Sequence, residues 1–398
     1  MNILKKIYQV PQNYYYFFFI IISLILFFLT EKIYKFDLDI TNEQDARYYI
    51  QIAKNPFLFF DLNPYYSSRL LSPLLVFVIS KLTGLNVYYS FKILVTIAFT
   101  ILNFNLFNFF KNNTNYLNSF LLILMLNFSN WVLLYNFFNP YQLLDLLTIL
   151  ISINLVIATL YANKFKMIIY SIFSILNKHY MVLLIVLCYL HSFIKKKENY
   201  YLYTMLFLII IFLVFHKLSG INFTTGSNEN LDIFKILFLW TQDTIIYFPK
   251  YIKSFFIDNN LPILMPFIFI LFNKKIISFL KENVLITLYP LFMTGLIIIM
   301  YDKFGGDNFS RIFYQAFYPL IMISYYKFFE INNNKYLFSI ILFLSLLLFA
   351  VEYFIFFINL NNNFVSYMVY ERYTQWYSPV YISSILTLIL LNYNVKKK

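Results

Sequence analysis

The hydrophobic pattern of this chain consists of long apolar runs separated by short polar stretches. The runs 14–30, 201–215 and 336–357 are long enough, or nearly so, to cross a hydrocarbon core of about 30 Å as helices. Hydrophobic residues make up 61% of the chain and charged residues only 12%, with a mean hydropathy of +0.68. This composition excludes a soluble globular domain. The sequence therefore predicts an all-α polytopic membrane protein.

The lysines form short clusters between the apolar runs and predict which loops share one side of the membrane. Basic loops are typical of the cytoplasmic side. The clusters expected inside are Lys5 and Lys6, Lys111, Lys164 and Lys166, Lys195 to Lys197, Lys274 and Lys275, Lys327 and Lys335, and Lys396 to Lys398. An even number of crossings must separate each pair, which gives about twelve transmembrane helices with both termini inside. Four lysines remain outside and count against this assignment, namely Lys32, Lys35, Lys54 and Lys81.

The expected crossings include one segment with an unusual length. Ten regions are read as single spans: 13–30, 86–110, 117–136, 141–162, 199–217, 261–273, 283–300, 309–328, 337–358 and 379–393. The segment 166–194 is basic at both flanks, so it should cross twice, yet each leg has only about 14 residues, or about 21 Å of helix. We interpret it as a short helical hairpin whose polar tip faces an external water-filled cavity. The alternative is one long tilted helix with a buried lysine.

A polar island follows the first apolar run, where this topology places the chain outside. Residues 45–53 read Asp-Ala-Arg-Tyr-Tyr-Ile-Gln-Ile-Ala, a pattern typical of an amphipathic helix resting on a membrane. Residues 70–84 follow as a short interfacial helix, since about 15 residues scarcely span a bilayer. The external first loop, 31–85, is therefore expected to carry juxtamembrane helices. Further external segments are expected at 218–257, with an amphipathic helix over 231–256, and at 361–378.

The same topology gathers the ionisable side chains at the external face. The residues placed there are Asp45, Arg69, Asp145, Lys178, His179 and the loop 301–308, which contains Asp307 and precedes Arg311. Ionisable groups in or beside lipid are costly and usually mark a functional site. The arrangement therefore predicts a single external active site.

Two acids in this set are candidates for acid–base or orienting roles. An external carboxylate such as Asp45 can act as a general base and take a proton from an acceptor hydroxyl. It can also stabilise the first turn of a helix. Other acids that could serve instead are Asp37, Asp39, Glu43 and Asp61. Asp145, one turn inside an apolar helix, needs a polar partner, and it either orients a catalytic group or satisfies a nearby lysine or arginine.

The basic residues suit a phosphate group. Arg69 could clamp a phosphate bidentately, or snorkel to the lipid headgroups. Lys178 offers a point charge for the phosphate or diphosphate of a lipid carrier, and His179 either relays protons or forms a structural hydrogen bond. Two glycines before Asp307 would let the backbone approach a phosphate closely, so that this loop, with Asp307 and Arg311, could cover the phosphate. Alternatively, these residues form only a loop and the start of a helix.

The absence of several motifs argues against ATP hydrolysis, the use of a nicotinamide cofactor and zinc-protease activity. It has no Walker-type phosphate loop, no dinucleotide fingerprint, no zinc-ligand motif and no serine nucleophile elbow. Cys188 is the only cysteine, which rules out a disulfide within the chain. The net charge of +13 is explained by the lysine clusters beside lipid, so no nucleic-acid partner is expected. The first apolar run lacks a cleavage site and is read as a retained helix.

The quoted residues resemble the GT-C class of membrane glycosyltransferases, which includes polyprenyl-phosphate-sugar-dependent, mannosyltransferase-like bacterial enzymes. Asp45 matches the position of the family's catalytic acid in the first external loop. The stretch Arg-Leu-Leu-Ser-Pro over 69–73 is similar to an Arg-x-Leu-x-Pro stretch that often follows the catalytic acid in bacterial members of the family. Asp307 and Arg311 resemble an Asp-x-x-x-Arg pattern found late in the sequences of bacterial relatives. Asp145 and Lys178 resemble further family positions. His179 departs from the family, which often carries an acid there.

The resemblance implies an inverting transfer of a sugar from a polyprenyl-phosphate donor to an acceptor hydroxyl on a glycan, lipid or protein. Asp45 would be the base, while Arg69, Lys178 and Arg311 would stabilise the departing phosphate. No cofactor is expected; a divalent cation is compatible with this chemistry but not indicated. The resemblance also implies a catalytic module over 1–217 and a variable module over 218–398, in a bacterial cytoplasmic membrane with the active site facing outside.

Three other classes remain as alternatives. A transporter or flippase of lipid-linked sugars predicts midplane charges and pseudo-symmetric halves, whereas the charges here are external and no internal repeat is evident. A polymerase or ligase of the O-antigen type would carry a large late external loop, for which 218–257 is a modest candidate. A non-catalytic subunit of a glycan-assembly machine is the third.

Overall fold

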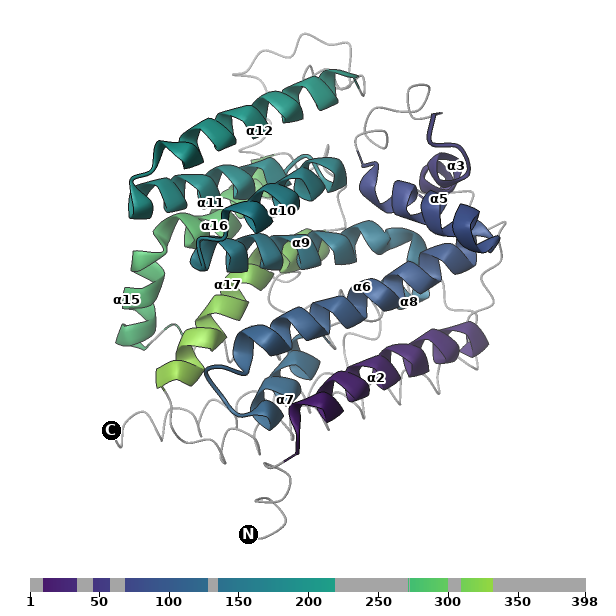
Figure 1. The fold of residues 1–398 in the computed structure, drawn as a ribbon, viewed down its shortest axis with the longest axis horizontal. Helices are drawn as coiled ribbons and strands as arrows, with labels where there is room; N and C mark the ends of the chain where they lie inside the picture. The colour runs from purple at the N-terminus through teal and green to yellow at the C-terminus, as the bar shows by residue number, and fades with distance from the viewer. Residues whose placement is uncertain are drawn as a thin grey trace.

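The computed structural model describes residues 10–33, 46–57, 69–127, 135–218, 271, 273–299 and 309–331. Within these ranges every regular element is a helix, and Figure 1 shows how the helices pack. The predicted all-α class is therefore confirmed for the described part of the chain.

Four of the described helices are long and apolar enough to cross a membrane. They are α2 (Gln12–Ile33), α6 (Val87–Phe110), α9 (Leu143–Leu160) with the preceding turn η4 (Pro140–Gln142), and α12 (Asn199–Leu218). Each coincides with an expected crossing. A fifth results if the bent pair α15 (Lys274–Glu282) and α16 (Val284–Ile299) counts as one span. Four or five such helices are typical of a multi-pass membrane protein. The total of about twelve crossings remains a prediction.

The other expected crossings are shorter, more polar or outside the described residues. Helix α7 (Tyr116–Asn127) is short, and residues 128–134 beyond it are not described. Helix α17 (Phe309–Ile331) is long enough but not apolar enough to pass as a span, and most of its described side chains are buried among the other helices. The segments 337–358 and 379–393, and nearly all of 261–273, lie outside the described residues.

The segment 166–194 forms a hairpin of two helices, as expected, rather than one long helix. Its tip was expected to face a water-filled cavity, but Asn177 and Lys178 are buried there because they hydrogen-bond to α9. Helix α10 (Lys164–Asn177) and helix α11 (Met181–Lys196) are joined by the turn that contains Lys178. Both helices pack against α9. The turn reaches the beginning of α9, because the Asn177 side chain donates to the backbone oxygen of Leu144.

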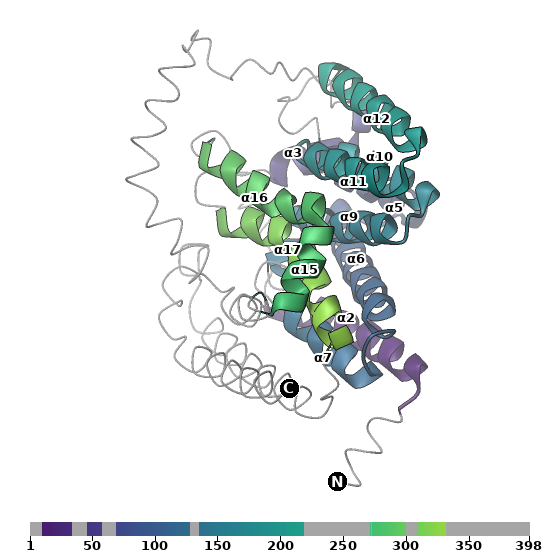
Figure 2. The ribbon, with the colours of Figure 1, turned by 90° about the vertical axis from the view of Figure 1, so that its left-hand side faces the viewer.

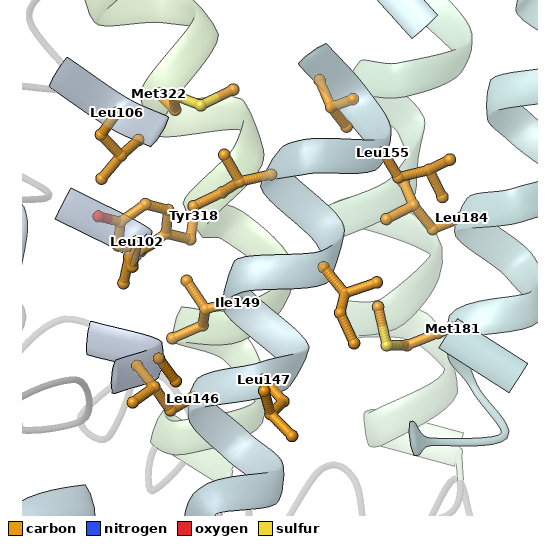
Figure 3. Packing of buried hydrophobic residues seen from close by; sticks show 14 of the residues in the cluster. Leu102, Leu106, Leu146, Leu147, Ile149, Leu155, Met181, Leu184, Tyr318 and Met322 are labelled. Carbon is orange, nitrogen blue, oxygen red and sulfur yellow. The ribbon is translucent and has the colours of Figure 1, made fainter. Parts of the chain in front are cut away.

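Helix α9 lies at the centre of the core. Most of its residues are apolar, and nearly all of its side chains are buried, as expected for a helix enclosed by others. Figure 3 shows Ile149 of α9 beside Leu102 of α6 and Tyr318 of α17. On the opposite side of α9, Leu155 lies next to Leu184 of α11. Helices from both predicted modules therefore contribute to one core.

A chain of hydrogen bonds joins three helices inside this core. The Tyr318 hydroxyl donates to Asn127 Oδ1, and Asn127 Nδ2 donates to Asn103 Oδ1 over 2.7 Å. All three side chains are fully buried. Among apolar helices such a contact contributes only about 0.6 kcal/mol, but it fixes which faces meet.

The lysine-rich segments meet at one end of the bundle, which we call the basic end. Its described lysines are Lys111, Lys164, Lys166, Lys195 to Lys197, Lys274, Lys275, Lys281 and Lys327. Lys164 Nζ pairs with Glu198 Oε2 at 2.5 Å, and Lys195 Nζ donates to Asn283 Oδ1 at 3.1 Å. The described lysines of the predicted inner clusters are thus close to one another, and the side of the membrane that they face remains a prediction.

The first loop, which is predicted to be external, contributes two helices at the opposite end, which we call the site end. Helix α3 (Ala46–Lys54) buries one face that includes Tyr49, and helix α5 (Leu71–Thr83) packs against it. Helix α5 ends at Gly84, whose φ of +71° is a left-handed conformation that glycine adopts without strain. The two expected short helices are therefore present; the described part of the loop leaves out 34–45 and 58–68.

Candidate functional site

The centre of the site is a buried ion pair between the hairpin turn and α9. Lys178 Nζ contacts Asp145 Oδ1, with Lys178 only 4% and Asp145 only 1% exposed. Lys178 directly follows α10, whereas Asp145 lies in the first turn of α9. The pair therefore lies at the ends of helices rather than in the middle of the bundle. Asp145 thus contacts a lysine, as one of the two predictions for it required.

The position of this lysine depends on the residue before it. Asn177 Nδ2 donates to Thr148 Oγ1 over 2.8 Å and to the backbone oxygen of Leu144 over 3.2 Å. Asn177 is fully buried. Since both acceptors belong to α9, the amide holds the turn against that helix. This contact explains how Lys178 reaches an acid 33 residues away.

Gln315 of α17 completes the environment of the lysine. Its Oε1 accepts from Lys178 Nζ over 3.0 Å and from the Tyr180 hydroxyl over 2.8 Å. A lysine can only donate, so the amide atom that faces it must be the oxygen. Gln315 is 1% exposed, and its Nε2 has no hydrogen-bond partner among the described residues. This amide nitrogen is thus a buried donor at the site whose hydrogen-bonding capacity is not used by the described residues.

Arg69 connects the two helices of the first loop. It lies just before α5, and its Nη1 donates to the hydroxyl of Tyr49 in α3 over 3.0 Å. Only 7% of Arg69 is exposed. The arginine is therefore held inside the protein and is not a flexible side chain that snorkels to the lipid headgroups.

His179 directly follows Lys178, and its pKa is affected by both cations of the site. Burial is the main cause that lowers its pKa from 6.5 to about 3, and the positive charges of Arg69, His216 and Lys178 lower it further. Its ring is 6.1 Å from that of His216 in α12, at an interplanar angle of 89°. At neutral pH His179 is consequently uncharged, because a protonated ring would be poorly hydrated and repelled by its neighbours.

The structure thus brings together four of the predicted site residues, Arg69, Asp145, Lys178 and His179. Asp45 and Asp307 lie outside the described residues, and for Arg311 only the backbone is described, one helical turn before Gln315. In the described part of the chain, no group of three or more potential metal ligands is present. Gln315 and the structural role of Asn177 were not predicted from the sequence. The one sequence feature that could have indicated Gln315 is its position, since it is an amide four residues after Arg311 on a helix rich in aromatic residues.

The charges of the described site favour the binding of an anion. Lys178 and Arg69 carry positive charge, Asp145 balances one of them, and His179 is neutral. Partly desolvated cations that are already held in place bind an anionic group without further ordering.

Comparisons with known proteins give no match to a protein-family model, to a curated protein or to a solved structure.

Proposed function

We propose that the protein is an integral membrane glycosyltransferase that moves a sugar from a polyprenyl-phosphate donor to an acceptor hydroxyl, with inversion. The observation that supports this proposal most strongly is the buried cluster of Lys178, Asp145 and Gln315, with Arg69 nearby, at the end of the bundle opposite the basic end. The active site would face the outside of a bacterial cytoplasmic membrane.

In the proposed reaction the acceptor oxygen attacks the anomeric carbon of the sugar. The bond between that carbon and the phosphate oxygen breaks, and the lipid phosphate leaves with the electron pair. Asp45 takes the proton of the attacking hydroxyl, as a general base does. Lys178 and Arg69 stabilise the charge on the departing phosphate. Asp145 and Gln315 keep the Lys178 ammonium group in position, so that little ordering is needed during the reaction.

The location of the charges favours transfer over transport. A transporter places its ionisable groups near the bilayer midplane between repeated halves. Asp145 lies in the first turn of α9, and Lys178 lies in a turn between helices. Both therefore belong to one end of the bundle, where a lipid-linked donor and an acceptor from the aqueous side can meet.

The proposal is tested by mass spectrometry of lipid-linked sugars and surface glycans. A deletion strain is complemented with the wild type, with Asp45→Asn or with Lys81→Gln, an exposed lysine at the same end. The Asp45 variant should lose one sugar from the glycan and accumulate the polyprenyl-phosphate donor, while the Lys81 variant should match the wild type. Membrane levels of each protein are measured alongside. Asp45→Asn protein that is inserted normally and restores the wild-type glycan would overturn the proposed base.

The deletion strain also tests the competing class. If deletion of the gene leaves every sugar linkage intact but traps a complete lipid-linked glycan on the inner face, the protein is a flippase. The transfer reaction is then excluded.

A further inference from the structure

Helix α15 lies across the basic end, and the described spans run away from it. Its axis turns by 89° relative to α16, which packs along α11. Figure 2 looks onto the basic end and shows α15 in front of α16 and α17. Because α16 coincides with the predicted crossing 283–300, a helix perpendicular to it runs parallel to the membrane surface. Its position at the basic end therefore places it at the level of the lipid headgroups.

The sequence of α15 separates an inner face from an outer face. Ile276 is fully buried, and Phe279 packs against the core of the protein. The lysines of α15 are all exposed: Lys274, Lys275 and Lys281. The outer face is therefore basic, and nothing in the described part of the protein covers it.

An N-terminal cap and contacts from two other helices hold α15 in this orientation. Asn273 caps its first turn by accepting from the backbone nitrogen of Lys275 over 3.0 Å. Lys195 of α11 donates to Asn283 at the bend, and Lys327 Nζ lies 5.4 Å from the centre of the Phe279 ring. A helix of nine residues is marginal by itself. These contacts thus explain why α15 persists and why its lysines point outward.

The neighbouring surface has the same character. Its other exposed lysines are Lys164, Lys166, Lys195, Lys196 and Lys197. Of the described acids nearby, Glu198 and Glu330 are paired with Lys164 and Lys327. The exposed Glu282 at the end of α15 offsets one of its three lysines, so the surface remains positive. Exposed apolar side chains are interspersed, with Phe165 at 72% and Ile194 at 62% exposed. Lysines that alternate with aromatic and aliphatic groups are typical of a surface in the headgroup region.

We propose that α15 and the surrounding lysines of the basic end bind the headgroups of anionic phospholipids. The negative phosphates complement the uncovered positive charge, and the alkyl stems of the lysines reach along the acyl boundary. This inference concerns the end opposite the proposed active site and does not depend on glycosyl transfer.

Native mass spectrometry of the purified full-length protein in detergent tests this proposal. The protein is titrated with phosphatidylglycerol and, separately, with phosphatidylcholine. The wild type should bind phosphatidylglycerol more tightly, and added salt should weaken that binding. The triple variant Lys274→Gln, Lys275→Gln, Lys281→Gln should lower the phosphatidylglycerol affinity by tenfold or more, since each lysine near an anionic lipid surface contributes roughly a factor of five.

The matched control removes equal charge from the site end with Lys54→Gln, Lys81→Gln, Lys217→Gln, three exposed lysines. It should change the affinity less than twofold. Equal losses in both variants, or wild-type affinity in the α15 variant, would overturn the proposal; the second result would point to an acidic protein as the partner. If the triple variant does not fold, Lys166→Gln, Lys196→Gln tests the same surface outside α15 and should lower the affinity at least fivefold.

Discussion

The two ends of the bundle use lysine in opposite ways. At the basic end Lys164 and its partner Glu198 are 45% and 44% exposed. At the site end Lys178 and its partner Asp145 are 4% and 1% exposed. Each end thus contains a close lysine–carboxylate pair, one in water or headgroups and the other inside the protein.

The difference shows that burial, rather than the ion pair itself, makes the site end distinctive. Water screens an exposed pair, so that it contributes little to stability. A buried pair has lost its hydration, and its two charges depend on each other and on added hydrogen bonds. Gln315 provides such a bond to Lys178. A costly arrangement of this kind is more consistent with a functional role than with a purely structural one.

The largest expected effect comes from breaking the buried pair on one side only. Lys178→Met leaves the Asp145 carboxylate buried without its partner and should lower the free energy of unfolding by about 3–5 kcal/mol. The double variant Lys178→Met, Asp145→Leu should recover most of this loss, because no charge then remains. Chemical denaturation in detergent micelles measures both. A double variant no more stable than the single one would show that the pair is not coupled as described.

A smaller effect is expected from the pH dependence of His179. The folded protein keeps this ring neutral down to about pH 3, whereas the unfolded chain binds a proton near pH 6.5. Stability is therefore lost as the pH falls below 6.5, by about 2 kcal/mol between pH 7 and pH 5. The variant His179→Gln should show correspondingly less loss over the same interval, measured by denaturation at both pH values. An equal loss of stability between pH 7 and pH 5 in the variant and the wild type would contradict a neutral His179 ring in the folded protein.

A smaller effect on stability is expected from a hydrogen bond in the interior between the two ends. Tyr318→Phe removes the hydrogen bond to Asn127 without changing the shape of the ring, and should lower the free energy of unfolding by about 0.6–1.7 kcal/mol. Tyr203→Phe, at an exposed tyrosine of α12, is the matched control and should have no effect. Equal destabilisation by both variants would show that the buried hydroxyl has no special role.

The smallest effect is expected at the exposed pair of the basic end. Glu198→Gln should leave the unfolding midpoint unchanged within error at high salt, because surface charges are screened there. The same measurement at low salt sets the upper limit of the effect. A loss at high salt comparable to that of Lys178→Met would remove the contrast between the two ends.

Much of the site could be predicted because lipid makes ionisable residues conspicuous in the sequence. Arg69, Asp145, Lys178 and His179 were singled out on that basis, and the structure brings them together. The hairpin also followed from its basic flanks, although its legs are shorter than an ordinary span. Asp45, Asp307 and the side chain of Arg311 remain predictions, as does the division into two modules.

The amides of the site were not predictable in the same way. Asparagine and glutamine are uncharged, and asparagine is abundant throughout this chain, so neither residue type stands out. Gln315 is 137 residues from the lysine that it contacts, and no local pattern connects the two. The bend of α15 was missed for a related reason, since its lysines were read only as a topological signal.

The sequence by itself determined the helical membrane class and the segments in which charge is concentrated, because the cost of exposing polar groups to lipid acts on every residue independently. Only the tertiary structure decided which acid meets Lys178, which amide holds it, and which lysines remain exposed. Those outcomes depend on distances between helices far apart in the chain, and packing of the whole core around α9 determines these distances.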